Sequence, residues 1–407
     1  MEQMNLFEVL YEKYKITKPI RLIELFGGIG SQAKALENLR EQGKLPMGFE
    51  HYRLVEFDKY PVASYNAVHG TNFEPTDITK IHASDLGIRE RERFEYILTY
   101  SFPCQDLSLA GKGRGMKKGS GTRSGLLWEV ERLLNECSEE LPQILLMENV
   151  PNLLGDKNIE DFKAWVRFLE DKGYSCYYEL LNAKNYGIPQ NRQRCFMISL
   201  LNSPSGEKYY YEFPKPVPLK LYLNDLIDEE VDPKYYLDKK MMELVSFDIS
   251  FRNKQFLLIK NATKKGFLEA YEGDGVDISA RMESHRGTVQ KGMSQTLKTA
   301  IEVGVVVNAP KCIGGFGKKY NDDYQYAMQN RIYDDKIATS ITTGFNPFYK
   351  TGLTIRKLIP KEAWRLMGFD DASFDRASKV NSNAQLYKQA GNSIVVNVLM
   401  AIFNQLL

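Results

Sequence analysis

The sequence predicts an α/β fold with a doubly wound, mostly parallel sheet. Short apolar runs alternate with amphipathic, charged stretches over the first 200 residues, and a glycine-rich turn follows the first apolar run. Strands that alternate with helical segments favour βαβ units and therefore a mostly parallel sheet. The 407 residues are enough for two domains.

The expected strands are short apolar runs, and the expected helices repeat apolar residues every three or four positions. Strands are expected at 20–26, 52–57, 96–100 and 144–147. Helices are expected at 31–39, 126–134, 162–169, 360–367 and 393–406. Four prolines between 202 and 218 exclude a helix there and indicate a domain boundary, after which 251–350 is rich in Gly, Thr and Asn and is expected to be loop-rich.

Composition excludes several classes of protein. Apolar residues make up 43% and charged residues 26%, with a net charge of +2 that by itself indicates no polyanionic partner. No apolar run approaches the ~18–20 residues that a membrane span needs. The N-terminus lacks the basic and apolar regions of a secretory signal. We therefore expect a cytoplasmic protein with no membrane partner.

Cysteine and histidine spacing gives no metal signature. The five cysteines, at 104, 137, 176, 195 and 312, form no Cys-x-x-Cys pair, and the four histidines, at 51, 69, 82 and 285, are scattered. Neither a disulfide framework nor a structural zinc site is expected, and we expect no metal. Most of these cysteines are expected to be small buried apolar side chains, with Cys104 as the exception.

A glycine turn joins the first strand to the first helix. Phe26-Gly27-Gly28-Ile29-Gly30-Ser31 lets a ligand approach the backbone, and the helix that follows offers free N–H groups. With Ala33 the turn matches a relaxed dinucleotide fingerprint. Taken alone, such a turn is as often only a tight connection between strand and helix.

Acidic residues follow at the ends of the next segments. Glu56 ends the second strand, where a ribose diol is usually held, and Phe57 is placed to stack on an adenine ring. Asp77 and Ile78 are a further contact near the adenine edge. Each acid alone is a solvated surface charge, but their order predicts a bound adenosine compound, either a dinucleotide or S-adenosylmethionine.

Cys104 follows an apolar run, at the sheet edge where ligands bind. The segment 107–124 after it contains five glycines and no acid, and its basic residues are Lys112, Arg114, Lys117, Lys118 and Arg123. Such a segment is either a disordered tether or a lid that closes over a phosphate backbone. Its positive charge favours the thiolate of Cys104 over the thiol.

A carboxylate and two arginines complete the chemistry. Glu148 ends another strand, and Arg192 and Arg194 point the same way if their segment is extended. A cysteine, a carboxylic acid and paired guanidiniums suit attack on an electron-poor heterocycle and do not suit hydride transfer.

With these motifs the chain resembles the DNA cytosine-5 methyltransferases of the bacterial and phage restriction–modification type. The matching motifs, in the family's order, are Glu24 to Ser31, Val55-Glu56, Asp77-Ile78, Phe102 to Gln105, Arg123 to Glu129, Glu148 to Val150, Gln190 to Arg194, Arg356 to Phe369 and Gln389 to Val395. They span most of the chain outside 200–355. Phe57 stands where the family often has Trp.

The resemblance implies a Rossmann-like, S-adenosylmethionine-dependent methyltransferase domain over 1–200, completed by 356–407. It implies a smaller, loop-rich target-recognition domain over 201–355, in which the family carries a Thr-Leu pair. Thr296-Leu297 matches the letters, whereas Ser340-Ile341 follows Arg331-Ile332-Tyr333 as the family's pair usually does, and we favour Ser340-Ile341. The implied partner is double-stranded DNA, the implied product is S-adenosylhomocysteine, and we expect a monomer. A functional pairing with a restriction endonuclease and a solitary enzyme both stay open.

The resemblance also implies residue roles. Cys104 would add to C6 of a flipped cytosine, Glu148 would meet N3, Arg194 would bind O2, and Arg192 would support Cys104 and Glu148. The implied cofactor contacts are Phe26, Gly28, Gly30, Ser31, Glu56, Phe57, Asp77, Ile78, Pro103, Leu126, Asn392 and Ser393. The implied DNA contacts are Gln105, Ser108, Lys112, Arg114, Lys117, Lys118, Ser340 and Ile341.

Two functions from other classes stay open. The first is a catalytically silent DNA-binding homologue, which the presence of Cys104, Glu148 and Arg194 argues against. The second is a dinucleotide-dependent oxidoreductase, which the identity of the cofactor retained by the purified protein would distinguish. No code connects the 251–350 segment to a DNA sequence, because recognition depends on a few side chains that reach base edges.

Overall fold

The computed structural model describes residues 11–103, 107, 123–138, 140–246, 256–279, 283–300, 302–308, 312–315, 331–333 and 353–407. The chain divides into two compact units. The first comprises Met1–Tyr186, Gln193–Pro218 and Met367–Leu407, and the second comprises Gly187–Arg192 and Leu219–Leu366. Within the described ranges, no helix combines the length and apolar character needed to cross a membrane.

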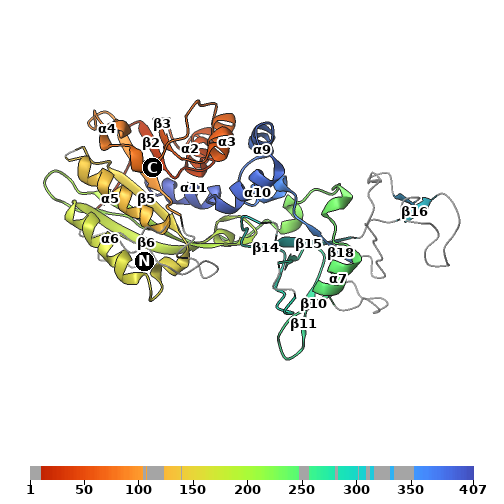
Figure 1. Ribbon diagram of the computed structural model, residues 1–407. Coiled ribbons are helices and arrows are strands. Elements are labelled where there is room, and N and C mark those ends of the chain that lie inside the picture. The colour runs from red at the N-terminus through yellow and green to blue at the C-terminus, as the bar shows by residue number, and fades with distance from the viewer. Residues whose placement is uncertain are drawn as a thin grey trace. The chain divides into compact units, whose positions relative to one another are not determined.

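A six-stranded sheet forms the centre of the first unit, in the order β3-β2-β4-β5-β8-β6 (Figure 1). Its strands are β2 (Ile20–Leu25), β3 (Phe49–Val55), β4 (Glu95–Tyr100), β5 (Ile144–Asn149), β6 (Tyr174–Asn182) and β8 (Gln193–Leu201). β8 is antiparallel to both of its neighbours, whereas the pairs β2–β3, β2–β4 and β4–β5 are parallel. The predicted doubly wound, mostly parallel sheet is therefore confirmed.

Helices cover both faces of this sheet. β2 alternates between the faces: Ile23 and Leu25 pack into a core with α5 (Leu127–Glu136) and α6 (Ile159–Asp171). On the opposite face, Glu24 of β2 accepts a hydrogen bond from the Ala33 N–H of α2 (Ser31–Glu41) at 3.4 Å. The described part of the unit also contains helices α3 (Lys59–His69), α4 (Ala83–Leu86), α9 (Asp371–Ser378), α10 (Asn383–Asn392) and α11 (Val396–Asn404).

The C-terminal helices return to the N-terminal part of the sheet. α11 packs against α2, and α9 packs against α3 (Figure 1). The helix expected at 393–406 begins only at Val396, because the Ser393 hydroxyl bonds back to the carbonyls of Gln389 and Ala390 and ends α10. The short parallel pair β1 (Glu12–Lys13) and β9 (Tyr209–Tyr210) also belongs to this unit.

The second unit is built around an antiparallel sheet of four short strands in the order β13-β12-β15-β18. These strands are β12 (Gly275–Asp277), β13 (Val289–Gln290), β15 (Val303–Asn308) and β18 (Leu353–Lys357). Its described elements also include the hairpin β10 (Leu257–Lys260) and β11 (Phe267–Ala270), the parallel pair β7 (Gln190–Asn191) and β14 (Ser294–Gln295), the pair β16 (Cys312–Gly315) and β17 (Arg331–Tyr333), and helices α7 (Lys239–Val245) and α8 (Pro360–Arg365).

Two segments expected in the cofactor domain belong to this second unit. Residues 187–192 join it because β7 pairs with β14. Residues 356–366 join it because Arg356 lies in β18 and its guanidinium binds the Glu362 carboxylate with two bonds of 2.7 and 2.9 Å. Both of these side chains are fully buried.

Replacing Glu362 with alanine is expected to destabilise the chain by about 3–5 kcal/mol, because it leaves the buried Arg356 charge without its partner. The matched control is Glu302→Ala, which removes an exposed i,i+4 pair with Lys298 and should cost at most about 1 kcal/mol. Urea denaturation of the full chain measures both. Equal losses of unfolding free energy in the two variants would mean that the buried pair stabilises the chain no more than the exposed pair does.

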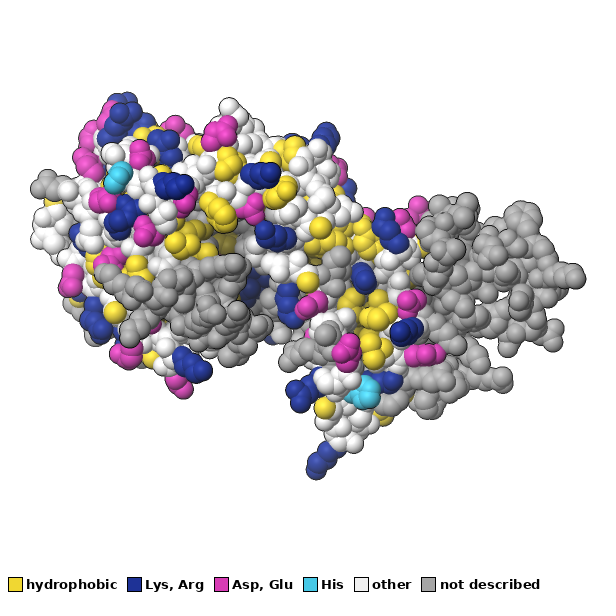
Figure 2. Space-filling view, in the orientation of Figure 1, with side chains coloured by type: hydrophobic (Ala, Val, Ile, Leu, Met, Phe, Trp, Pro, Cys, Tyr) yellow, Lys and Arg dark blue, Asp and Glu magenta, His cyan; other side chains and the backbone are white. Residues whose placement is uncertain are grey.

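Charged side chains of both signs are interspersed over the described surface seen in Figure 2. This agrees with a composition of 54 basic and 52 acidic residues. Any electrostatic preference for a polyanion therefore has to come from a local feature and not from the charge of the whole chain.

Candidate active site

Four predicted motifs meet at one edge of the large sheet. β2, β4 and β5 are parallel and end at Leu25, Tyr100 and Asn149. β8 is antiparallel to β5, so its first residues, from Gln193, lie at the same edge. The carboxyl ends of strands in such sheets are where ligands bind.

The glycine turn is held in a conformation that requires glycine. Gly28 and Gly30 have φ of 57° and 78°, and Phe26 before them has φ of 56°. A Cβ on Gly30 would lie 2.4 Å from His69 Nε2, whereas a Cβ on Gly28 would meet nothing within 4 Å. The space at Gly28 is therefore open to a ligand, and the space at Gly30 is filled by protein.

Glu56 directly follows β3 and connects this strand to the glycine turn. One carboxylate oxygen accepts the Gly28 N–H at 3.3 Å, and the other accepts the Asp58 N–H at 2.9 Å. Burial raises the pKa of Glu56, and these two backbone bonds oppose the rise. Phe57 follows with 76% of its surface exposed, so its ring is available for stacking.

The other predicted cofactor residues differ in their surroundings. Asp77 caps the 3-10 helix Ile78–Lys80 by accepting the Thr79 N–H at 3.0 Å, and Ile78 is buried. At the start of α2, the Ser31 hydroxyl accepts the Ile394 N–H at 3.2 Å. This bond fixes the Asn392–Ser393 segment beside the glycine turn. Leu126 ends the 3-10 helix Arg123–Leu126 and is partly buried.

Glu148 and Arg194 form an ion pair at this edge. Arg194 Nε lies 3.2 Å from Glu148 Oε1, and both side chains are largely shielded from solvent. The pair follows from the antiparallel register of β5 and β8, in which Glu148 lies opposite Phe196. Two of the residues predicted to act on the base are thus brought together.

Cys104 lies outside the described residues, as do Gln105, Ser108, Lys112, Arg114, Lys117, Lys118, Ser340 and Ile341. The chain on both sides of 104–106 is anchored near Glu148. The Phe102 carbonyl accepts Asn149 Nδ2 at 3.0 Å, and the Leu107 carbonyl accepts Asn152 Nδ2 at 2.5 Å. Pro103 is held by the Ser124 hydroxyl at 2.7 Å.

These anchoring side chains were missed as site residues by the sequence analysis. Asn149 and Ser124 stand inside the motifs Glu148-Asn149-Val150 and Arg123-Ser124-Gly125, so a signal was present. Asn152 lies two residues beyond the first motif and carried no signal of its own.

Cysteines 137, 176 and 195 are poor nucleophiles. Burial raises the pKa of Cys137 and Cys176 to about 11 and that of Cys195 to about 12. All three therefore remain thiols near neutral pH. The expectation of buried, apolar cysteines is confirmed at Cys137 and Cys195, whereas Cys176 is partly buried.

Arg192 has a different environment from Arg194. It belongs to the second unit, is buried, and donates from Nη1 to the Leu297 carbonyl at 2.9 Å. The neighbouring Thr296 hydroxyl donates to the Asn191 carbonyl at 2.6 Å. The two arginines were expected to point the same way along one extended segment. That segment is not one strand, because β7 ends at Asn191 and β8 begins at Gln193. Arg192 bonds Leu297, whereas Arg194 pairs with Glu148. Through the bonds to Asn191 and Arg192, the Thr296-Leu297 pair contacts the arginine motif directly.

Comparisons with known proteins point to one family. The family model described as C-5 cytosine-specific DNA methylase matches residues 20–407. The type II methyltransferase M2.ScrFI of Lactococcus lactis subsp. cremoris is 34% identical over 308 residues, which cover 76% of this chain and 65% of that protein. The orphan methyltransferase M.SssI of Spiroplasma monobiae is 31% identical over 332 residues, covering 68% of this chain and 83% of that protein.

Solved structures show the same fold. The Entamoeba histolytica methyltransferase EhMeth aligns with a TM-score of 0.60 at 14% identity, covering 96% of this chain and 98% of its own. The S. pombe Dnmt2 methyltransferase aligns with a TM-score of 0.56 at 18% identity, covering 95% and 98%. The first unit accordingly has the Rossmann-like fold of these methyltransferase structures. Because the family model extends over nearly the whole chain, this protein belongs to the C-5 cytosine-specific DNA methylase family.

Proposed function

We propose that the chain methylates C5 of a cytosine in double-stranded DNA, with Cys104, Glu148 and Arg194 as its catalytic side chains. Family membership supports the reaction. The observation that carries the residue assignment is the Glu148–Arg194 pair, at the sheet edge to which Phe102, Pro103 and Leu107 are anchored. The three residues 104–106 connect the anchored positions Pro103 and Leu107. This short connection supports a Cys104 thiol that acts beside Glu148.

The chemistry follows from the weakness of C5 as a nucleophile. The Cys104 thiolate adds to C6, which moves electron density to C5. Glu148 holds a proton at N3 and so stabilises the negative charge that develops in the ring. Arg194 donates to O2 of the base and keeps the Glu148 carboxylate in position. Bound S-adenosylmethionine supplies the methyl group. The C5 proton then leaves, and the thiolate is expelled from C6.

A cytosine inside a duplex is not accessible to these groups, so the base must flip out of the stack. We propose that Gln105, Ser108, Lys112, Arg114, Lys117 and Lys118 contact the DNA on the catalytic side. Phosphate contacts from lysine and arginine position the duplex without reading its sequence. We assign sequence reading to the second unit, with either Ser340-Ile341 or Thr296-Leu297 as the family's Thr-Leu pair. The Thr296 and Leu297 bonds to the arginine motif favour the latter.

We propose that the glycine turn and the residues around it bind S-adenosylmethionine. Open space at Gly28, the Glu56 carboxylate and the exposed ring of Phe57 suit a nucleoside with a ribose diol. Asp77, Ile78, Pro103, Leu126, Asn392 and Ser393 complete the proposed set. The proposed partners are DNA and, functionally, a restriction endonuclease, as the names of type II relatives suggest. The chain would act in the cytoplasm as a monomer, and its product would be S-adenosylhomocysteine.

Replacing Glu56 with alanine is expected to weaken S-adenosylmethionine binding by roughly tenfold to a hundredfold. The loss arises because ribose hydroxyls left without an acceptor cost ~1–3 kcal/mol. Isothermal titration calorimetry measures the dissociation constant. Glu50→Ala, on the strand β3 that Glu56 follows, changes a largely exposed side chain; it is the control and should not change the dissociation constant. A Glu56 variant that binds as tightly as the parent would show that another group holds the ribose.

Bisulfite sequencing tests the proposed function. Plasmid DNA from a methylation-free host that expresses the chain should contain cytosines protected from conversion at one recurrent sequence. A duplex with 5-fluorocytosine at that position should form a covalent adduct with the protein, because fluorine cannot leave C5 as a proton does. If bisulfite converts every cytosine although the protein binds both DNA and S-adenosylmethionine, the silent DNA-binding homologue is favoured.

A further inference from the structure

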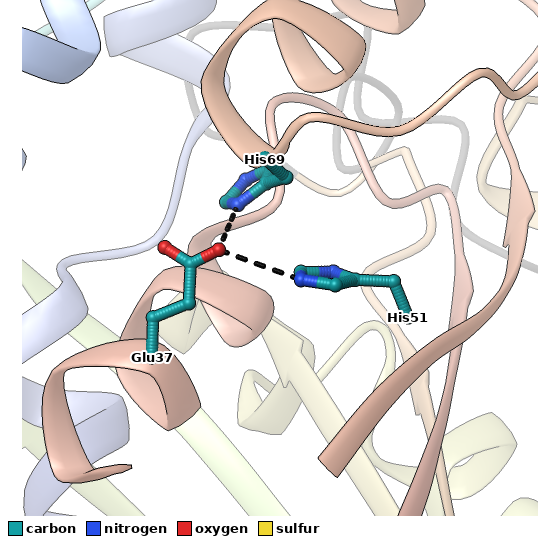
Figure 3. Close-up of side chains that lie close together, drawn as sticks. All are labelled: Glu37, His51 and His69. Atoms are coloured by element: carbon teal, nitrogen blue, oxygen red, sulfur yellow. Dashed lines mark hydrogen bonds and ion pairs between the residues drawn. The ribbon is translucent and has the colours of Figure 1, made fainter. Parts of the chain in front are cut away.

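Three side chains from three elements of the first unit converge beneath the glycine turn. Glu37 belongs to α2, His51 to β3, and His69 is the last residue of α3. Glu37 Oε1 lies 2.8 Å from His69 Nδ1 and 3.4 Å from His51 Nε2 (Figure 3). One ligand atom from each of the three lies within 4.8 Å of the other two. Among the described residues this is the one such group of three.

In each histidine, the inner ring nitrogen faces Glu37 and the outer ring nitrogen faces away from it. Each outer nitrogen lies beside an oxygen atom that fixes the ring. His69 Nε2 lies 3.0 Å from the Ile29 carbonyl, which can only accept, so this nitrogen carries a proton. His51 Nδ1 lies 3.1 Å from the Tyr65 hydroxyl, which in turn donates to Glu24 at 2.5 Å. Metal-bound histidines almost always donate their second N–H in this way, which fixes the ring and its tautomer. In these tautomers the inner nitrogens of both rings present lone pairs to Glu37.

A cation accounts for this arrangement better than hydrogen bonds alone. The Ile29 contact leaves a lone pair on His69 Nδ1 that faces the Glu37 oxygen at 2.8 Å, a contact that a cation between the two atoms would satisfy. The lone pair of His51 Nε2 faces the same oxygen at 3.4 Å. A single ion among the three atoms would satisfy all of them with both imidazoles neutral.

The Glu37 carboxylate is available as a ligand. Its side chain is 13% exposed, and Oε1 faces the inner ring nitrogens of both histidines. Lys34 does not compete for the inner oxygen. Its Nζ lies 3.7 Å from Glu37 Oε2 and 2.6 Å from Asp370, which balances its charge.

We propose that Glu37, His51 and His69 bind one zinc ion. Two imidazoles and a carboxylate are ligands that zinc accepts, whereas magnesium and calcium prefer oxygen ligands alone. Tetrahedral bonds of about 2.0–2.1 Å place ligand atoms roughly 3.3–3.4 Å apart. The Glu37–His51 separation of 3.4 Å already fits, and the Glu37–His69 separation of 2.8 Å has to open by about half an ångström. Water would occupy the fourth position.

The ion would act as a structural tie. It would join α2, β3 and α3, and through His69 it would support the turn, because His69 bonds the Ile29 carbonyl and fills the space beside Gly30. Binding to the folded state alone stabilises that state by mass action. Zinc should therefore raise the unfolding temperature of the chain, and its removal should lower it.

Metal analysis of the full chain tests this directly. The chain carries Cys104→Ser, which removes that thiol as a competing ligand, and is stripped with a chelator and dialysed before titration. Zinc sulfate should bind with a stoichiometry near one ion per chain and raise the unfolding temperature by a few degrees, whereas magnesium chloride at the same concentration should do neither. Cobalt(II) should bind at the same site and give the visible absorption of a tetrahedral centre. A stripped chain that takes up neither metal would show that the cluster is a carboxylate–imidazolium pair.

Variants distinguish this site from adventitious binding. His51→Gln is used because His51 is partly exposed. It should weaken zinc binding at least about tenfold, since loss of even an outer-shell partner of a ligand typically costs that much. His82→Gln is the matched control, since His82 also contacts a glutamate, Glu136, but its side chain is 74% exposed. It should bind zinc as the parent does. Equal zinc affinity in the two variants would overturn the assignment, and circular dichroism verifies that both are folded.

Discussion

Cys104→Ala is expected to abolish methyl transfer while leaving S-adenosylmethionine binding nearly intact, because the thiol acts on the base and not on the cofactor. The loss should reach at least about 10⁴-fold, the scale seen when an enzyme loses its nucleophile. Transfer of a radiolabelled methyl group to DNA measures the rate, and calorimetry measures cofactor binding. The 5-fluorocytosine adduct should also disappear.

The matched control is Cys176→Ala. Cys176 lies in β6 and donates to the Ser199 hydroxyl at 3.3 Å, and burial raises its pKa to about 11. It should therefore stay protonated, and its loss should leave the methylation rate close to that of the parent. Robust turnover by Cys104→Ala would end the covalent mechanism, and a comparable loss in both variants would point to a folding defect.

Glu148→Gln is expected to lower kcat by about 10²–10⁴-fold, the contribution typical of general acid–base catalysis. Glutamine keeps the shape of the side chain but cannot hold a proton for N3. It also removes the charge that pairs with Arg194 at 3.2 Å. The measurement is the single-turnover rate of methyl transfer at saturating DNA and cofactor, so that weaker binding does not contribute.

Glu160→Gln makes the same change on the exposed surface of α6, where Glu160 pairs only weakly with Lys163, and should leave the rate unchanged. A Glu148→Gln variant that reacts within a few fold of the parent would remove the carboxyl group from the chemistry. Arg194 would then be the remaining candidate for stabilising charge on the base.

Local pattern predicted the parallel part of the sheet well. β4 and β5 are buried along their whole length and β2 at every residue except Arg21, and buried strands of a parallel sheet give largely apolar sequence. β6 and β8 were not predicted. β6 exposes several of its residues, including Tyr178 and Leu180, and so lacks the unbroken apolar run of a central strand.

The sequence by itself predicted the residues that we propose to carry the chemistry: the glycine turn, Glu56, Cys104, Glu148 and the arginines stand in a recognisable order along the chain. Tertiary structure alone decided which of them meet. The antiparallel register of β5 and β8 pairs Glu148 with Arg194, while β7 turns Arg192 towards Leu297. Glu37, His51 and His69 looked unrelated in sequence because a helix, a strand and a second helix bring them together. Such contacts depend on strand order and helix packing across long sequence separations, which no local spacing records.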